Sequence, residues 1–205
     1  QNSRLHLDNL YPETIYDAAF ENKGENRRLY RPVSNLSIAV NWYFGKTDVI
    51  GYHIFNISIH ILTAFFLYLT CVNLLKTPNL SGQYSDNAYF IAVLAACLWA
   101  LNPIQTQAVT YIVQRMAAMA AIFYIMGMYC YLKARFGDTW TKRLFWSLGV
   151  VLSFLLAVGS KENAILFPIS LFLVEMVFFQ NMANPEIRKK MLLGGSLVLI
   201  IVFAA

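Results

Sequence analysis

The sequence predicts an all-α fold, a polytopic bundle of membrane-spanning helices with short amphipathic helices at the membrane interface. Of its 205 residues, 58% are hydrophobic, and the mean hydropathy is +0.50. That composition is too apolar for a soluble domain of this length. Polar stretches divide the chain into six apolar segments, which are residues 51–75, 88–101, 116–132, 144–158, 164–179 and 191–205.

The length of the fourth and fifth segments predicts a helical hairpin. Residues 144–179 would make one helix of about 54 Å, whereas the hydrocarbon core is about 30 Å thick. They must therefore fold back, and the polar run Ser160-Lys161-Glu162-Asn163 is the turn. Since the chain begins with Gln1 and stops within an apolar run, we expect a piece of a longer protein. We divide it into an outer loop, residues 1–50, and a bundle, residues 51–205, with five complete spans and one truncated.

Two polar stretches are expected to form short helices that do not cross the membrane. Within residues 34–44 and just before them, apolar side chains recur at helical spacing, which predicts an amphipathic helix on the outer membrane surface. These side chains are Val33, Leu36, Val40 and Tyr43. Pro103 should end the second apolar segment, because proline cannot continue a helix and restricts the residue before it. A single span over residues 104–132 would be too long, so residues 104–114 should lie flat or dip into the protein.

The positions of the basic residues predict the orientation. If the segments alternate, residues 76–87, 133–143 and 180–190 lie on one side and carry eight Lys or Arg residues. The short loops of the other side carry only Arg115 and Lys161. Positive charges in short loops stay in the cytoplasm, so residues 1–50, 102–115 and 159–163 should lie outside it. The net charge of +5 is modest, and no nucleic-acid partner is expected.

Charged side chains in the outer loops suggest an anionic ligand. The set is Arg27, Arg28, Arg31, Arg115, Lys161 and Glu162. Cations outside oppose the usual topology bias, and a phosphate or pyrophosphate on a lipid carrier would suit them, because Arg offers forked hydrogen bonds and Lys a point charge. The alternative is that they are solvated loop charges or contacts to lipid headgroups. For Lys161 and Glu162, the alternative is a pair that keeps the hairpin turn at the interface.

Polar residues within the first segment share one helix face. His53, Asn56 and His60 follow one another at helical spacing, and such residues usually face the bundle. His53 is near the outer end and could touch a substrate, whereas His60 is expected to be a hydrogen-bonded packing residue. Asp48 should cap the helix, and no metal site is expected. Four glycines are expected at close packing contacts: Gly127, Gly149, Gly194 and Gly195.

Four motifs in this order resemble the membrane region of the transmembrane and tetratricopeptide-repeat glycosyltransferases, which include animal O-mannosyltransferases and bacterial relatives. The motifs are LYRPVS at 29–34, GYHIFN at 51–56, NPIQTQAV at 102–109 and SKE at 160–162. The stretch VQRMAA at 113–118 resembles the bacterial branch most.

The resemblance implies a GT-C type fold with an outward-facing site and a polyprenyl-phosphate-linked sugar as donor. It implies that Arg31, Arg115 and Lys161 bind the donor phosphate, with Glu162 in a supporting role. A catalytic acidic pair is expected before Gln1, as is an N-terminal helix, and helical repeats are expected after residue 205. Candidates for substrate contact are Tyr30, His53, Asn102 and Gln107. Asn102 and Gln107 stand where many relatives have His and Glu, which puts an acid–base role of that loop in doubt.

The function expected is therefore transfer of a sugar from a polyprenyl-phosphate donor to a protein or peptide acceptor outside the cytoplasm, in the bacterial inner membrane with the site facing the periplasm. A carboxylate would act as base, and Arg and Lys would stabilise the departing phosphate. No cofactor beyond this lipid-linked donor is expected, and a divalent metal is not implied. Membrane lipid and a protein complex formed through the repeats are the other expected partners. The alternatives are a non-catalytic membrane anchor or assembly subunit, and a transporter of a lipid-linked substrate.

Overall fold

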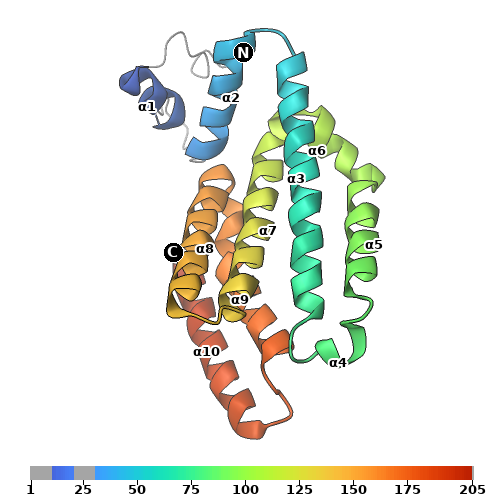
Figure 1. The fold of residues 1–205 in the computed structure, drawn as a ribbon. Helices are drawn as coiled ribbons and strands as arrows, with labels where there is room; N and C mark the ends of the chain where they lie inside the picture. Colours follow the sequence, from blue (N-terminus) through green and yellow to red (C-terminus); the bar gives the residue numbers. More distant parts are fainter. Residues whose placement is uncertain (1–10, 21–30, 205) are drawn as a thin grey trace.

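The computed structural model describes residues 11–20 and 31–204, with side chains up to Gly195, and these residues form helices and turns without a strand (Figure 1). This confirms the predicted all-α polytopic bundle. The elements are α1 (Pro12–Phe20), α2 (Pro32–Gly45), α3 (Ile50–Leu75), α4 (Ser81–Tyr84), α5 (Ala88–Ala100), η2 (Pro103–Gln105), α6 (Thr106–Thr110), η3 (Ile112–Gln114), α7 (Arg115–Arg135), α8 (Trp140–Ser160), η4 (Glu162–Leu166), α9 (Phe167–Val174), η5 (Glu175–Phe179) and α10 (Pro185–Ala204).

Among the described residues, four helical stretches are long and apolar enough to cross a membrane. They are Ile50–Leu75, Ile112–Arg135, Trp140–Ser160 and Glu162–Phe179. A fifth crossing results if Ala88–Ala100 and Pro103–Thr110, which meet at an angle of 52°, act as one broken span. The helix α5 has 13 residues, or about 20 Å at 1.5 Å per residue, so it is too short to cross alone.

The polar connections collect at the two ends of the bundle. In Figure 1, α2, α6, the first turns of α3 and α7, and the turn from α8 to η4 lie at one end, which we call the site end. The opposite end holds α4, the turn between α7 and α8, and the start of α10. Helix α3 packs between α5 and α7, and α7 packs on α8. The structure therefore groups the polar stretches at two ends in the same way as the sequence did, when successive apolar segments were assumed to cross in alternating directions.

The break after α5 has the predicted cause. Pro103 cannot continue the helix α5. The side chain of Asn102 caps η2 by accepting a hydrogen bond from the Ile104 amide at 3.0 Å. Residues 104–114 are helical in short turns, as predicted, but they form three short pieces and not one helix. Tyr111 is extended between α6 and η3, and η3 leads directly into α7.

The predicted helix over 34–44 is confirmed as α2, but its polar residues do not all face away from the protein. The Ser37 carbonyl and the Asn41 side chain turn inward to Arg115. Val33 packs against the core cluster of Ile59 and Met119. Figure 1 shows α2 standing over the end of α8 beside the first turns of α3. These two groups of α2 accept hydrogen bonds from the buried Arg115, and this contact holds α2 in place.

The predicted hairpin turn is also confirmed. Helix α8 ends at Ser160, Lys161 is extended (φ −156°, ψ 135°), and η4 begins at Glu162. The Ser34 hydroxyl lies 3.3 Å from the Ser160 carbonyl and donates to it, which fastens α2 to this turn. A Cβ atom at Gly159 would lie 2.7 Å from Val33 Cγ2, so this glycine lets α2 approach α8. The sequence did not single out Gly159.

Glycines allow close contacts within the bundle, as predicted for Gly127 and Gly149. A Cβ at Gly149 would lie 3.0 Å from Cys130 Sγ, and one at Gly127 would lie 2.7 Å from Phe167 Cζ and 3.1 Å from Ser153 Cβ. A Cβ at Gly195 would also be too close, at 2.8 Å from Phe172 Cε1, whereas one at Gly194 would make an ordinary contact at 3.8 Å. The prediction therefore holds for three of the four positions.

We expect Gly127→Ala to destabilise the bundle by about 1–3 kcal/mol, the usual cost of overpacking a filled core. The Phe167 ring cannot move aside easily, because it is buried between Tyr124 and Phe154. The measurement is the unfolding midpoint of the purified protein in detergent. Gly82→Ala is the matched control, since a Cβ there meets nothing within 4 Å. An unchanged midpoint for Gly127→Ala would contradict the packing described.

Candidate functional site

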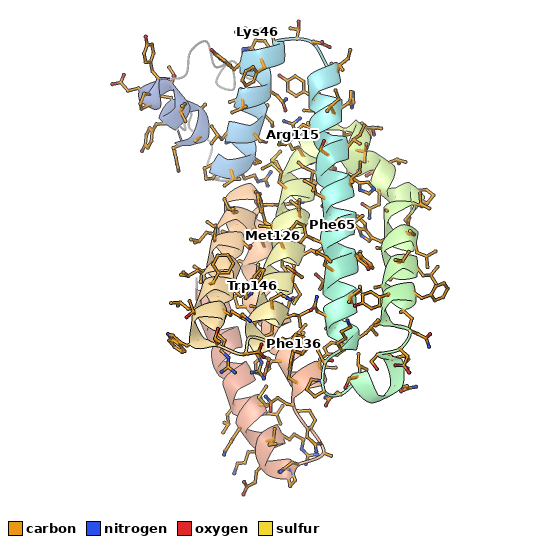
Figure 2. The ribbon with its side chains drawn as sticks, in the orientation of Figure 1. Lys46, Phe65, Arg115, Met126, Phe136 and Trp146 are labelled. Atoms are coloured by element: carbon orange, nitrogen blue, oxygen red, sulfur yellow. The ribbon has the colours of Figure 1, made fainter. Side chains whose placement is uncertain are left out.

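Arg115 is the first residue of α7, and its side chain is fully buried beneath α2 and the first turns of α3 (Figure 2). Its Nε donates to Asn56 Oδ1 at 2.9 Å, and its Nη2 donates to the Tyr52 carbonyl at 3.1 Å. Its Nη1 donates to Asn41 Oδ1 and, at 3.2 Å, to the Ser37 carbonyl. The guanidinium therefore joins three helices through four neutral acceptors.

The surroundings of Arg115 compensate for the burial of a charge. Among the described residues no carboxylate pairs with it, and burying an unpaired ion is costly. The guanidinium lies 4.6 Å from the centre of the Phe55 ring and 5.4 Å from that of Tyr52, where the ring faces attract a cation. Asn56 also donates to the Val109 carbonyl at 3.3 Å, so the network extends to α6. Arg115 thus fixes how α2, α3, α6 and α7 meet.

Arg31 and Glu162 form a two-pronged ion pair at the same end of the bundle. Arg31 Nε lies 2.9 Å from Glu162 Oε2, and Arg31 Nη2 lies 2.7 Å from Glu162 Oε1. The third nitrogen, Nη1, lies 3.0 Å from Met116 Sδ. The side chains are 19% and 43% exposed, so solvent weakens the pair and its main effect is geometric. It holds the start of α2 against the turn that carries Lys161.

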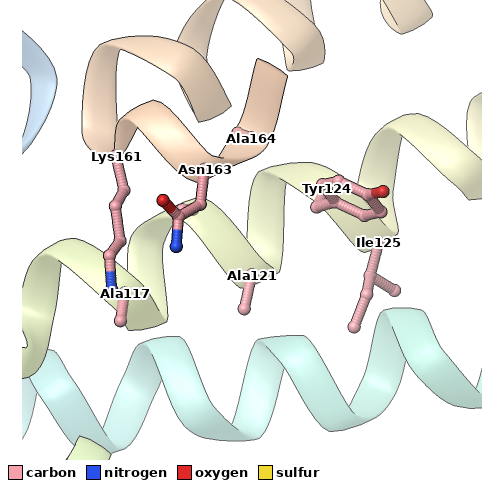
Figure 3. Close-up of a pocket in the computed structure, with 8 residues that line it drawn as sticks. Ala117, Ala121, Tyr124, Ile125, Lys161, Asn163 and Ala164 are labelled. Carbon is pink, nitrogen blue, oxygen red and sulfur yellow. The ribbon is translucent and has the colours of Figure 1, made fainter. Parts of the chain in front are cut away.

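Lys161 borders a cavity of about 400 Å³ between that turn and α7 (Figure 3). Lys161, Asn163 and Ala164 form one wall. The other wall is α7, with Ala117, Ala120, Ala121, Tyr124 and Ile125. In Figure 3 the Lys161 side chain extends toward Ala117. In the part of the chain that the structure describes, Lys161 Nζ makes no hydrogen bond or ion pair, so its charge is available to a ligand.

A second cavity, of about 280 Å³, shares Ala117 and Ala121 with the first. Ala118 of α7 also lines it, and its other side is formed by α3, α5 and the short stretch after Pro103, through His60, Thr63, Trp99, Gln105 and Ala108. We call the two adjoining cavities the α7 groove. On one side the groove has the charge of Lys161 and the amide of Asn163. On the other side it has the Trp99 ring and the polar side chains of Thr63 and Gln105.

The two histidines of α3 differ in their surroundings. His60 Nε2 is 3.1 Å from the Ala100 carbonyl, and the ring stacks on Trp99 with centroids 5.1 Å apart. The packing role predicted for His60 is therefore confirmed, although one side of the ring also borders the groove. His53 is half-buried and lines neither cavity of the groove. The N-cap of α3 is Val49, and Asp48, one residue earlier, accepts from the Ile50 amide at 3.0 Å, so the expected capping bond comes from the position before the N-cap.

The remaining predicted residues are distributed as follows. Asn102 is exposed and serves as the cap after α5, and Gln107 is exposed on α6. Tyr30, Arg27 and Arg28 lie outside the described residues. No group of three or more His, Cys, Asp or Glu side chains suited to a metal is found in residues 11–20 and 31–204.

The structure brings together Arg31, Lys161 and Glu162, but it does not bring Arg115 into the cavity beside Lys161. Reasoning from the sequence missed Asn41, the partner of Arg115, and the alanines that open the groove. Asn56 had a usable signal, because it lies on the polar face of α3 beside His53. The alanines had none, since alanine is common in any apolar helix.

Comparison with known proteins finds similarity to protein O-mannosyl-transferases. The chain is 31% identical to protein O-mannosyl-transferase tmtc2 of Xenopus laevis over 133 residues, which are 60% of the chain and 14% of that protein. It is 25% identical to protein O-mannosyl-transferase TMTC3 of Homo sapiens over 171 residues, 78% of the chain and 17% of that protein. For protein O-mannosyl-transferase TMTC4 of Mus musculus the identity is 28% over 150 residues, 68% of the chain and 20% of that protein.

The chain thus spans only 14% to 20% of the lengths of these relatives. No family model matches the chain, and no solved structure is significantly similar to it. These relatives come from animals, so they give no support to the bacterial branch or the bacterial inner membrane expected from the sequence. The similarity, together with the apolar helices, supports a membrane protein related to glycosyltransferases.

We expect Arg115→Met to destabilise the protein by about 3 kcal/mol or more, because it leaves the buried Asn56 oxygen, the half-buried Asn41 oxygen and two carbonyls without their donor. The measurement is the unfolding midpoint of the purified protein. The exposed neighbour Gln114→Ala is the control and should change stability by less than about 0.5 kcal/mol. An Arg115→Met protein as stable as the wild type would contradict a structural role for this guanidinium.

Proposed function

We propose that this protein is a membrane glycosyltransferase that transfers a sugar from a polyprenyl-phosphate donor to a protein acceptor, and that the α7 groove is the site of transfer. The observation that carries this proposal is Lys161, a cation without an ion-pair partner among the described residues, on the wall of a cavity whose other wall is apolar. The similarity to protein O-mannosyl-transferases supports the reaction class.

Lys161 binds the donor phosphate. Its ammonium group is a point charge on a flexible stem, and it neutralises the negative charge that grows on the phosphate as the bond to the sugar breaks. The alanines of α7 leave room beside it, and Tyr124 and Ile125 provide an apolar surface for the first part of the polyprenyl chain. A cation next to an apolar wall matches a ligand that joins a phosphate to a hydrocarbon.

Arg31 and Glu162 support Lys161. Two of the three Arg31 nitrogens bind the carboxylate, which offsets the charge of Arg31, and the third faces Met116, so Arg31 has no open fork for phosphate and acts by holding the turn in place. Both oxygens of Glu162 accept from Arg31, which leaves this carboxylate poorly placed to act as the base. The base is a carboxylate of the acidic pair expected before Gln1.

Arg115 is a positioning residue in this proposal. Its N–H groups are taken up by protein acceptors, and its contact with Asn56 holds the carbonyl of Val109 near α3. Residues Gln105 and Ala108, which border the groove, belong to the same short stretch. Arg115 therefore sets the shape of the groove and does not itself contact the phosphate.

The sugar and the acceptor occupy the side of the groove next to α3 and α5. Trp99 gives a flat apolar surface there, while Thr63 and Gln105 provide groups that hydrogen-bond to hydroxyls. Asn102 and Gln107 flank Gln105 in the chain and lie exposed at the rim, where a protein acceptor approaches. His53 and Tyr30 stay candidates for substrate contact.

The site end is proposed to face away from the cytoplasm. The opposite end carries the eight basic residues of its short loops, which is the bias expected for the cytoplasmic side. We therefore expect a cysteine at Asn163 to react with an impermeant maleimide added to the extracytoplasmic side of sealed vesicles, and a cysteine at Thr139 to be protected. Both positions are exposed, and the labelling needs a background without Cys71, Cys97 and Cys130. The reverse pattern would overturn this orientation.

Replacing Lys161 tests the reaction most simply. Loss of a charged hydrogen bond to the phosphate costs about 1.5–3 kcal/mol, so Lys161→Ala should slow transfer by roughly tenfold to 150-fold if the contact tightens in the transition state. Transfer from polyprenyl-phosphate mannose to protein is measured in membranes with equal amounts of folded enzyme. Lys161→Arg should restore part of the rate.

Lys142→Ala is the matched control, because this lysine is exposed at the opposite end of α8. It should transfer at the wild-type rate. Equal rates in wild type and Lys161→Ala would contradict the proposed site. No transfer by the wild type with any lipid-linked sugar would favour a membrane anchor without catalysis.

A further inference from the structure

A third cavity lies at the end of the bundle opposite the α7 groove, between the end of α7 and the beginning of α8. Its volume is about 390 Å³. Arg135 and Arg143 line it near the ends of the two helices, and Tyr131, Ala134, Ser147, Val150 and Val151 line the rest. Nothing in the proposed transfer reaction uses this cavity.

The lining changes from charged to apolar along α8. Arg143 is in the first turn of the helix, Ser147 is one turn further, and Val150 and Val151 come another turn on, toward the middle of the bundle. These positions share one side of the helix, since they are separated by four, three and one residues. The cavity therefore has a cationic mouth at the helix ends and an aliphatic interior.

Both arginines are held in place by contacts that leave N–H groups open. Arg143 Nε donates to the Gly137 carbonyl at 2.8 Å, and the stem of Arg143 packs so closely over Gly137 that a Cβ there would lie 3.0 Å from Arg143 Cγ. Arg135 Nε and Nη2 bind Glu175 at 2.9 and 3.0 Å, and its guanidinium lies 4.8 Å from the Phe179 ring centre. Within the described ranges, both Nη atoms of Arg143 and Nη1 of Arg135 make no hydrogen bond.

The charges around the mouth do not balance. Glu175 is matched by Arg135 and also accepts from Tyr131 and Gln180. The other nearby acidic group, Asp138, is paired with Lys142 at 3.8 Å. Among the described residues this leaves the charge of Arg143 without a counter-ion. An anion at the mouth would supply one.

We propose that this cavity binds a phospholipid with an anionic headgroup. The phosphate takes the open N–H groups of Arg143 and Arg135 in forked hydrogen bonds, and the Ser147 hydroxyl donates to it from one turn deeper. An acyl chain continues along Val150 and Val151. This ligand is a structural lipid of the leaflet at the basic end, distinct from the polyprenyl-phosphate donor at the site end.

The lining favours a lipid over a soluble anion. A free phosphate would gain nothing from the aliphatic interior, whereas an acyl chain removes that surface from water. Basic pockets between membrane helices on the cytoplasmic side are a common way to hold anionic headgroups. Trp140, which is 78% exposed at the start of α8, is placed where aromatic residues anchor helices at the headgroup level.

The test uses the purified protein in nanodiscs of phosphatidylcholine and phosphatidylglycerol, with native mass spectrometry to count the lipids that stay bound. The wild type should retain phosphatidylglycerol in preference to phosphatidylcholine. Arg143→Gln should reduce this preference about tenfold, the effect of one lost charged hydrogen bond. Lys142→Gln, its exposed neighbour paired with Asp138, is the matched control and should keep the preference.

A second variant tests the apolar part of the cavity. Val150→Phe fills the interior without changing a charge, so it should lower retention of both lipids by several-fold. Unfolding midpoints in pure phosphatidylcholine nanodiscs show that the variants are folded. The proposal is overturned if Arg143→Gln retains phosphatidylglycerol like the wild type, or if Lys142→Gln loses it equally. It is also overturned if the wild type retains no anionic lipid because another part of the protein fills the cavity.

Discussion

The guanidinium of Arg115 is removed from solvent, and the described residues offer it no carboxylate. A cation in that position is tolerated only if its nitrogens find acceptors. Four groups from α2 and α3 converge on the first residue of α7 and accept from all three nitrogens. Asn56 passes the constraint on to α6 through the Val109 carbonyl. The position of α2 over the end of the bundle follows from this one requirement.

Membrane thickness sets the rest of the fold, and that part could be predicted from the sequence. The run of residues 144–179 is too long for one crossing, which located the turn at Lys161. The bend at Pro103 follows from the missing N–H of proline. The inward turn of Asn41 could not be predicted, because periodicity gives the polar face of a helix but not the buried cation that attracts it. Periodicity also did not predict that residues 103–114 divide into three short pieces, because it does not show where the backbone becomes extended, as it does at Tyr111.

The positions of the charged residues in the sequence predicted which of them gather at the candidate site, but not how they pair. Arg31 is far in sequence from the neighbouring residues Lys161 and Glu162, and their gathering at one end follows from alternation of the spans. The sequence could not show that Arg31 and Glu162 pair with each other while Lys161 has no partner in the part of the chain that the structure describes, since that depends on side-chain distances. The sequence also could not distinguish Arg115, whose hydrogen bonds go to groups of the protein itself, from an arginine that binds a ligand. The cavities themselves arise from alanines, which carry no signal of their own in an apolar segment.

In the proposed site the two cations have different tasks: Lys161 binds the phosphate, and Arg115 shapes the groove that holds the phosphate. The most direct measurement is a structure of the protein with a polyprenyl phosphate bound. The account predicts a phosphate within hydrogen-bond distance of Lys161 Nζ, the first isoprene units against Tyr124 and Ile125, and Arg115 still bonded to Asn41 and Asn56. A phosphate that displaces Asn41 or Asn56 from Arg115, or one bound away from the α7 groove, would contradict it.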